Sequence, residues 1–212
     1  MTFSVTKSLE QSQKNEELQS MLADRVSDWK QIHGMPIYWF GDYYPYYRFR
    51  DHELTRQQSD FRDFLITFKG NYERGTSVIN HHRAMRAVAE SLQTFLINVF
   101  GDLTRELTLV CAYASTQKTY VRRFGEFSDL VCKGVSMTNA MPYIKYLSDG
   151  QPKHMKGDKA PSLESDDDFF RNRNVILFDD LVTSGTTISL VRQWMENSGA
   201  HVIAAISLGR TV

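Results

Sequence analysis

The sequence predicts an α/β protein in which a mostly parallel sheet is flanked by helices. The main observation is a set of short apolar runs, which are typical of strands buried on both faces of a parallel sheet. These runs lie at 107–112 (LTLVCA), 175–178 (VILF) and 202–208 (VIAAISL). Segments with helical spacing of apolar residues separate them, and strands that alternate with helices favour a parallel sheet covered on its faces.

The composition is ordinary for a soluble globular chain of 212 residues, with 42% hydrophobic and 24% charged residues. Lys and Arg together number 25, as do Asp and Glu, so the formal net charge is zero. A neutral chain is a poor candidate for non-specific nucleic-acid binding, and no apolar run approaches the length of a membrane span. The two cysteines, Cys111 and Cys132, form no CxxC pair, and we expect Cys111 to be a small core residue.

The amino-terminal segment predicts one long helix. Apolar residues recur at three- and four-residue spacings through residues 8–32, and Gly34 and Pro36 end the pattern. The segment is too polar for a secretory signal, so we expect a cytoplasmic protein. We assign residues 1–35 to a helical extension and residues 36–212 to the main domain.

An aromatic segment follows at residues 37–49 (IYWFGDYYPYYRF). Its composition favours short strands that break at Gly41-Asp42 and at Pro45. We prefer an aromatic layer packed on the core, and a base-stacking platform is the alternative.

The middle of the chain alternates between helices and strands. We expect helices at 54–69, 80–99 and 119–135 and a further strand at 143–147. The adjacent residues His81-His82 do not predict a metal site, because neighbouring side chains on a helix point in different directions.

Residues 148–168 carry Gly, Pro, Lys and Asp without periodicity. This segment predicts a long mobile loop, and long loops in compact domains often serve as functional lids. Its three candidates for contacting a ligand are Lys153, Lys156 and Lys159, and a purely solubilising loop is an equal alternative. The acidic run Asp166–Asp168 is interpreted as a solvated loop end.

Two carboxylates, Asp179 and Asp180, directly follow the apolar run at 175–178. Ligands of open α/β sheets bind at the carboxyl ends of strands, so these residues stand at the mouth of a site. Small residues at 183–187 then lead into a helix that starts near Ile188 and ends at Gly199. A helix amino terminus preceded by small hydroxyl residues favours an anion cradle.

A carboxylate pair beside an anion cradle suits a ligand that offers hydroxyls or a cation next to its phosphate. A ribose 5-phosphate has this arrangement. The alternative is a simple turn at Asp179-Asp180 with Ser184 or Thr186 as a helix cap, which explains one hydroxyl residue but not the whole pattern.

The segment VILFDDLVTSGTT at 175–187 resembles the phosphoribosyl-pyrophosphate (PRPP) binding motif of the type I phosphoribosyltransferases. The arrangement around it is similar to the ComF-type, competence-associated branch, on the evidence of SLGRT at 207–211, YVRRFGEFSDLV at 120–131 and YRFRDHELTRQQSDFRDFLITFKG at 47–70. The resemblance is tight over 174–211, loose over 47–147 and absent before about residue 36.

The resemblance implies a fold and a reaction. The fold is type I phosphoribosyltransferase-like, and the reaction displaces pyrophosphate from PRPP by a nitrogen nucleophile. Mg²⁺ would be carried mainly by PRPP oxygens, with no metal site made by the protein. The resemblance implies that the catalytic pair Asp179 and Asp180 binds the ribose hydroxyls. It implies that the 5′-phosphate is bound by Thr183, Ser184, Gly185, Thr186 and Thr187.

The pyrophosphate loop implied by the resemblance follows the strand at 107–112. Its candidates are Ser115, Thr116, Lys118, Arg122 and Arg123, and Arg122-Arg123 as a solvated helix start is an equal alternative. A hood over the acceptor would fall among residues 37–49 and the segment after Arg48.

The chain departs from the family pattern at two places. It lacks the amino-terminal CxxC zinc ribbon of many ComF-type proteins, which weakens a role in DNA uptake. Thr183 stands where the enzymes for 6-oxopurines carry an acid, so such purines are disfavoured as acceptors. A non-catalytic sensor of PRPP or nucleotides and a DNA-uptake accessory protein are the alternative functions. The acceptor and the oligomeric state, a homodimer included, stay open.

Overall fold

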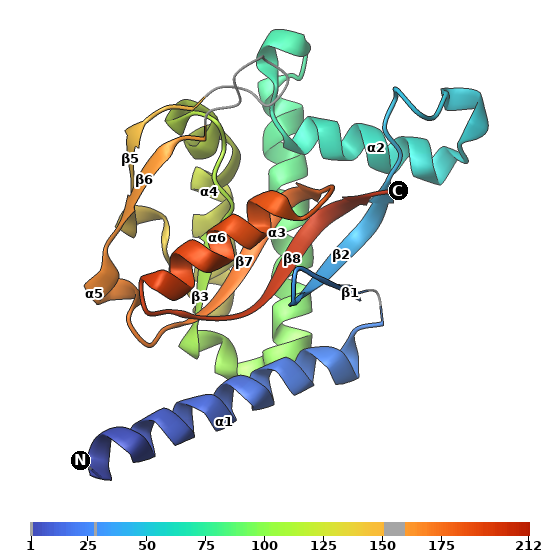
Figure 1. Ribbon diagram of the computed structural model, residues 1–212. Helices are drawn as coiled ribbons and strands as arrows, with labels where there is room; N and C mark the ends of the chain where they lie inside the picture. The colour runs from blue at the N-terminus through green and yellow to red at the C-terminus, as the bar shows by residue number, and fades with distance from the viewer. Residues whose placement is uncertain (1, 28, 151–159) are drawn as a thin grey trace.

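The computed structural model describes residues 2–27, 29–150 and 160–212, and its central feature is a six-stranded sheet (Figure 1). The strand order is β1-β2-β8-β7-β3-β4, and all neighbouring pairs are parallel except β1 with β2. This confirms the predicted α/β class with a mostly parallel sheet. The strands are β1 (Trp29–Ile32), β2 (Met35–Tyr43), β3 (Leu107–Cys111), β4 (Thr138–Asn139), β7 (Asn174–Val182) and β8 (His201–Thr211).

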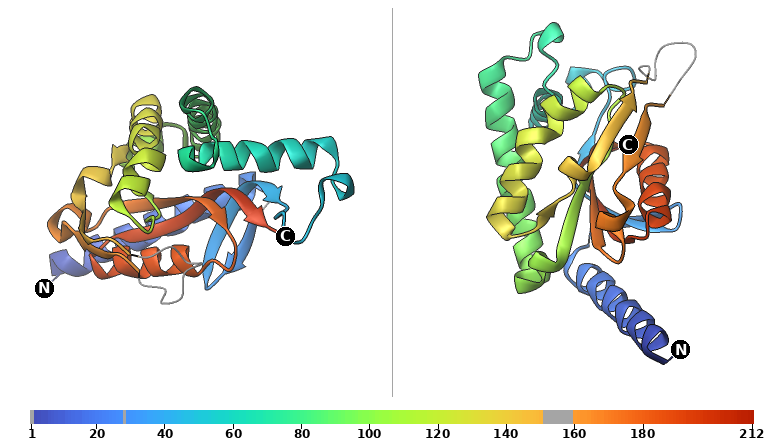
Figure 2. Two further views of the ribbon diagram at one scale, coloured as in Figure 1. Left: turned by 90° about the horizontal axis from the view of Figure 1, so that it is seen from above. Right: turned by 90° about the vertical axis from the view of Figure 1, so that its left-hand side faces the viewer.

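Helices cover both faces of this sheet (Figure 2). Helices α2, α3 and α4 lie on one face, and α6 lies on the other. The predicted helices at 54–69, 80–99 and 119–135 are confirmed to within two residues at each end. Their bounds are α2 (Arg56–Phe68), α3 (Val78–Phe100), α4 (Gln117–Val135) and α6 (Thr186–Asn197), with short 3₁₀ turns η1 (Asp51–Glu53), η2 (Tyr72–Arg74), η3 (Gly101–Glu106) and η4 (Met141–Tyr143).

The side chains of β7 alternate between two hydrophobic clusters, one on each face of the sheet. Ile176 and Phe178 belong to the cluster that contains residues of α2, α3 and α4. Val175 and Leu177 belong to the cluster that contains residues of α6. Successive side chains of a strand point to opposite faces, so this alternation also sets the directions of the next two residues of the strand.

Strand β2 runs without interruption from Met35 to Tyr43, so the prediction that it breaks at Gly41-Asp42 was wrong. Gly41 pairs with Gly209 of β8 within the sheet. A Cβ atom on Gly41 would lie 2.7 Å from the ring of Phe61. The glycine therefore lets α2 approach the sheet closely, and it does not mark a turn.

The amino-terminal helix α1 (Thr2–Arg25) begins and ends earlier than the helix predicted over residues 8–32. Residues 29–32, which were assigned to the helix, form β1 and pair with β2 in an antiparallel hairpin. Hydrogen bonding across the hairpin outweighs the helical spacing of Trp29 and Ile32. Leu18 and Leu22 of α1 are fully buried in the same cluster as residues of α3. The boundary predicted at residue 35 falls inside this hairpin, so the described part of the extension shares the core of the main domain.

The strand expected at 143–147 is observed as β5 (Ile144–Ser148), in a separate antiparallel pair with β6 (Ser162–Ser165). The prediction of one long loop over 148–168 was therefore wrong for its last part, which also contains the short helix α5 (Asp167–Phe170). Asp166 accepts a hydrogen bond from the Phe169 N–H and caps α5. The three lysines proposed for a lid, Lys153, Lys156 and Lys159, lie outside the described residues.

Candidate functional site

The carboxyl half of β7 places Asp179 and Asp180 on opposite faces of the sheet. Asp179 lies on the same face of the sheet as Val175 and Leu177. It is half-buried and lines a pocket beside the amino terminus of α6. Asp180 continues the series of Ile176 and Phe178 and is buried. The two adjacent acids therefore stand in different environments, as the period of a strand requires.

Asp180 is held by two cations from the helices on its face. Its Oδ2 lies 2.5 Å from Nη1 of Arg123 on α4, and its Oδ1 lies 3.4 Å from Nζ of Lys69, which follows α2. Burial raises the pKa of the Asp180 carboxyl, but the nearby Arg123 and Lys69 charges outweigh burial and hold the pKa below its ordinary value. Asp180 is thus a buried carboxylate engaged by the protein itself.

Asp179 has the opposite electrostatic character. Burial and the charge of Asp180 raise the pKa of Asp179 to about 7, against the opposing effects of Lys69 and Arg123. Its Oδ1 accepts a hydrogen bond of 2.8 Å from the Asp180 N–H, which orients the carboxyl group. Near neutral pH this group can both accept and donate a proton, so it can bind hydroxyl groups in either state.

The loop at 183–187 leads from β7 into α6, which begins at Thr186. Gly185 has a φ of 80°, in the left-handed region that favours glycine, and it makes no side-chain cap for the helix. The Ser184 and Thr186 hydroxyl oxygens lie 2.8 Å apart. The five residues Thr183, Ser184, Gly185, Thr186 and Thr187 all line the same small pocket as Asp179.

The first-turn N–H groups of a helix lack acceptors within the helix and carry a partial positive charge. The pocket at the start of α6 therefore combines anion-attracting backbone groups, hydroxyl donors and one carboxyl group. Such a set of groups can hold a molecule that carries a phosphate at one end and hydroxyls close to it.

The five residues predicted for a pyrophosphate loop are dispersed. Ser115 and Thr116 lie in the connection between β3 and α4, and Thr116 accepts a hydrogen bond from the Thr119 N–H as the cap of α4. Lys118 is exposed. The Arg122 guanidinium stacks over the ring of Tyr72 at 5.5 Å, and Arg123 binds Asp180. A shared role of these five residues stays a prediction.

The start of the predicted lid touches this same connection. The Gly150 N–H donates to the Ser115 carbonyl at 2.7 Å, and Asp149 Oδ1 accepts from the Gln117 N–H at 2.7 Å. Residues at the carboxyl end of β5 therefore lie against the first turn of α4.

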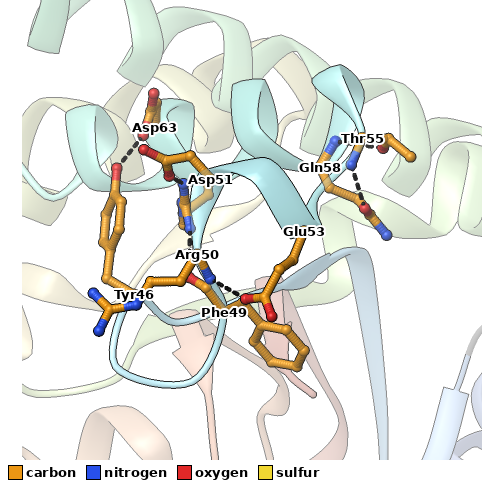
Figure 3. Close-up of polar contacts among 9 residues, drawn as sticks. Tyr46, Phe49, Arg50, Asp51, Glu53, Thr55, Gln58 and Asp63 are labelled. Carbon is orange, nitrogen blue, oxygen red and sulfur yellow. Dashed lines mark hydrogen bonds and ion pairs between the residues drawn. The ribbon is translucent and has the colours of Figure 1, made fainter.

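The segment predicted as a hood is anchored on α2 (Figure 3). The Tyr46 hydroxyl donates to Asp63 at 2.7 Å, and the buried Arg62 side chain pairs with Asp51 and stacks on the Tyr46 ring at 3.7 Å. Thr55 and Gln58 form a capping box at the start of α2. These contacts fix the segment before α2 against that helix, and Tyr47 within the segment is exposed.

The histidine pair has separate partners. His81 is buried with its Nδ1 2.7 Å from the Tyr72 hydroxyl, while His82 pairs with Glu126 at 2.9 Å. Within the described residues, no three His, Cys, Asp or Glu side chains are grouped to hold a metal ion. None of the helices described is long and apolar enough to cross a membrane.

Sequence reasoning missed two contributors to the site. Lys69 lies near Asp180 only in the folded structure. No local sequence pattern predicts that a residue after α2 contacts a strand far along the chain. His33 lies in the β1–β2 turn with Nε2 3.2 Å from the Ser184 carbonyl oxygen. The dipeptide His33-Gly34 between apolar segments is a turn signal that the prediction of a helix up to residue 32 obscured.

Comparisons with known proteins give structural similarity only. No family model matches the chain, and no curated protein matches it significantly. One similar solved structure is Leishmania donovani UMP synthase, with a TM-score of 0.39 and 14% identity over 63% of this chain and 24% of that chain. Another is a hypoxanthine phosphoribosyltransferase from Staphylococcus aureus, with a TM-score of 0.36 and 10% identity over 60% of this chain and 72% of that chain. A purine phosphoribosyltransferase from Pyrococcus horikoshii has a TM-score of 0.30 and 14% identity over 62% of this chain and 86% of that chain. The matched part of the chain spans about a quarter of the Leishmania protein.

Proposed function

We propose that this protein binds PRPP through its ribose 5-phosphate part and transfers the phosphoribosyl group to a nitrogen nucleophile with release of pyrophosphate. The observation that carries the proposal is that Asp179 and residues 183–187 line one pocket at the carboxyl end of β7. The sequence resemblance of 175–187 to the PRPP motif supports the same ligand. Membership of the ComF-type branch stays a prediction from the sequence motifs.

In this proposal the 5′-phosphate sits against the first turn of α6 and the Ser184 and Thr186 hydroxyls. Hydrogen bonds to a charged oxygen contribute roughly 1.5–3 kcal/mol each, so several such bonds outweigh the modest attraction of the helix end alone. Asp179 accepts hydrogen bonds from the ribose hydroxyls. Asp180 reaches the ribose only when its ion pairs with Arg123 and Lys69 open, so Asp179 has the main role in binding.

Mg²⁺ fits this site as a companion of the substrate. Mg²⁺ retains several non-protein ligands, and the pocket offers one carboxylate, Asp179, beside the position proposed for the ribose. When bound, the ion would neutralise the charge that develops on the leaving pyrophosphate. The protein's own contribution is to hold the phosphate and the ribose in place.

A non-catalytic sensor of PRPP or nucleotides is the second candidate, favoured by the engagement of Asp180 in ion pairs. The two candidates differ in one measurable outcome. A transferase releases pyrophosphate from PRPP in the presence of a suitable nucleobase, whereas a sensor binds PRPP without release for every base tested. A screen of nucleobases for pyrophosphate release therefore separates them.

The binding test uses thermal unfolding of the full chain with PRPP and Mg²⁺. A ligand at 100 times its Kd stabilises the folded state by about 2.7 kcal/mol, which corresponds to a rise in Tm of roughly 5–10 °C for a chain of this size. We expect this rise in the wild type and its loss in Asp179→Asn. Asp102→Asn, which changes an exposed carboxylate in an ion pair with Arg105, is the matched control and should retain the shift. No stabilisation of the wild type by millimolar PRPP would contradict the proposal.

A further inference from the structure

The tip of the β1–β2 hairpin rests on the loop that lines the pocket. His33 Nε2 lies 3.2 Å from the carbonyl oxygen of Ser184, and since a carbonyl only accepts, the Nε2–H is the donor. Ile32 approaches the next residue so closely that a Cβ atom on Gly185 would lie 2.6 Å from the Ile32 Cγ2. Two consecutive residues of the hairpin thus lie against two consecutive residues of the loop.

The hairpin tip is itself fixed in position. His33 and Gly34 have φ values of 49° and 73°, and together they form the turn between the strands. The Arg192 Nη1 on α6 donates to the Gly34 carbonyl at 2.9 Å, and its Nε pairs with Glu196 at 2.7 Å. The next residue, Met35, is buried in the cluster that includes residues of α6. The tip is therefore anchored from both sides, and it can serve as a rigid support for the loop.

The contact with Ser184 constrains the group that follows it. The carbonyl and the N–H of a trans peptide point in opposite directions, so a Ser184 carbonyl directed at His33 turns the Gly185 N–H away from the hairpin. The chain has no cis peptide bond among the described residues. Gly185 also lines the pocket, so an N–H turned away from the hairpin can serve as one of the donors offered to an anion.

We propose that His33 is a positioning residue of the phosphate site, which acts through Ser184 to orient the Gly185 N–H toward the bound phosphate. This inference rests on the proposed function and deepens it, because it adds a residue from outside the PRPP motif to the same site. His33 does not line the pocket, so it contributes by holding the loop and not by touching the ligand. The chemical class of the ligand is a phosphate monoester such as that of ribose 5-phosphate.

The test compares two substitutions at the same position by calorimetric titration of the full chain with PRPP and, separately, with ribose 5-phosphate. His33→Leu removes the donor, while His33→Gln retains an N–H at a similar reach. Both variants bear the same cost of the left-handed backbone at this position, so the comparison isolates the hydrogen bond. One hydrogen bond of about 0.5–1.5 kcal/mol corresponds to a change in Kd of roughly 2- to 13-fold.

We expect His33→Leu to weaken both ligands by several-fold and His33→Gln to bind within about twofold of the wild type. Gln31→Leu introduces the same apolar side chain at an exposed position of β1 and should bind as the wild type does. Unfolding in urea checks that all three variants are folded, so that a loss of binding cannot come from a loss of structure.

The outcomes separate this inference from the proposed function. A wild type that binds neither ligand removes the proposed function and this inference with it. A wild type that binds, together with a His33→Leu variant that binds equally well, overturns this inference alone. Equal weakening in His33→Leu and His33→Gln also overturns it, because the retained N–H would then have no effect.

Discussion

Asp180 and Arg123 form a buried ion pair, with 2.5 Å between Oδ2 and Nη1 and 5% of the Asp180 side chain exposed. Lys69 is a second cation 3.4 Å from the same carboxylate. One buried negative charge is therefore shared by two positive charges, one from within α4 and one from the residue that follows α2. Removing one partner of a buried pair leaves an uncompensated charge, which makes this the most sensitive electrostatic feature of the site.

Arg123→Met should lower the free energy of unfolding by about 2–4 kcal/mol, somewhat less than the full cost of breaking a buried pair because Lys69 remains. Urea denaturation measures the change. Arg105→Met removes the same kind of side chain from an exposed pair with Asp102 and should change stability by about 0.5 kcal/mol or less. The double variant Arg123→Met with Asp180→Asn should recover part of the loss, and no recovery would argue against the ion pair as the cause.

The raised pKa of Asp179, about 7, predicts a pH-dependent cost to stability. An unfolded aspartate has a pKa of about 3.9, so between these two values the folded state binds more protons than the unfolded state. The free energy of unfolding is therefore not lowered by Asp179 below about pH 4. It falls as the pH rises from about 4 to about 7, and it stays at the lower value above that. Asp179→Asn should match the wild type near pH 4 and be more stable by about 1–3 kcal/mol at pH 8.

Urea denaturation from pH 4 to pH 8 tests this prediction. The asparagine retains an oxygen that can accept the hydrogen bond from the Asp180 N–H, so the comparison isolates the charge. A constant difference between the variant and the wild type over the whole range would show that Asp179 has an ordinary pKa.

Gly185→Ala should destabilise the protein and disrupt the pocket for two separate reasons. The φ of 80° costs an alanine about 1–2 kcal/mol, and the Cβ would lie 2.6 Å from the Ile32 Cγ2, so a further steric cost of about 1–3 kcal/mol follows. Gly75, with a φ of 91° and open space at its Cβ position, is the matched control. Gly75→Ala should show the backbone cost alone.

The steric part can be isolated by a second substitution. Ile32→Ala removes the methyl group that the new Cβ would meet, so the double variant should recover stability relative to the sum of the single variants. Unfolding by urea gives this coupling energy. Strict additivity would mean that the hairpin does not press on the loop.

The parts of the fold that follow from local pattern were predictable. The buried runs ending at Phe178 and Leu208 and the helix before Gly199 have strong signals, because burial on both faces and helix capping leave clear marks in the sequence. Residues 183–187 of the motif line one small pocket with Asp179, and their role in binding a phosphate stays a prediction. These features depend on residues that are close together along the chain.

The remaining features depend on distant contacts. Trp29 and Ile32 fit a helical spacing as well as a strand, and only pairing with β2 decides between the two. Gly41 has the composition of a turn residue, but its role is to admit Phe61. The placement of Asp179 and Asp180 on opposite faces of the sheet follows from the period of a strand. The cations that pair with Asp180 come from other elements, and the local sequence does not predict them.

The packing of Leu18 and Leu22 in the central cluster has a practical consequence for anyone who shortens this protein. A truncated version beginning at residue 36 would expose apolar side chains of the central cluster. It would also leave β2 as an unpaired edge strand, which favours aggregation. Expression plans, fusion designs and deletion series should therefore keep the first helix and hairpin attached, even when only the pocket beside α6 is of interest.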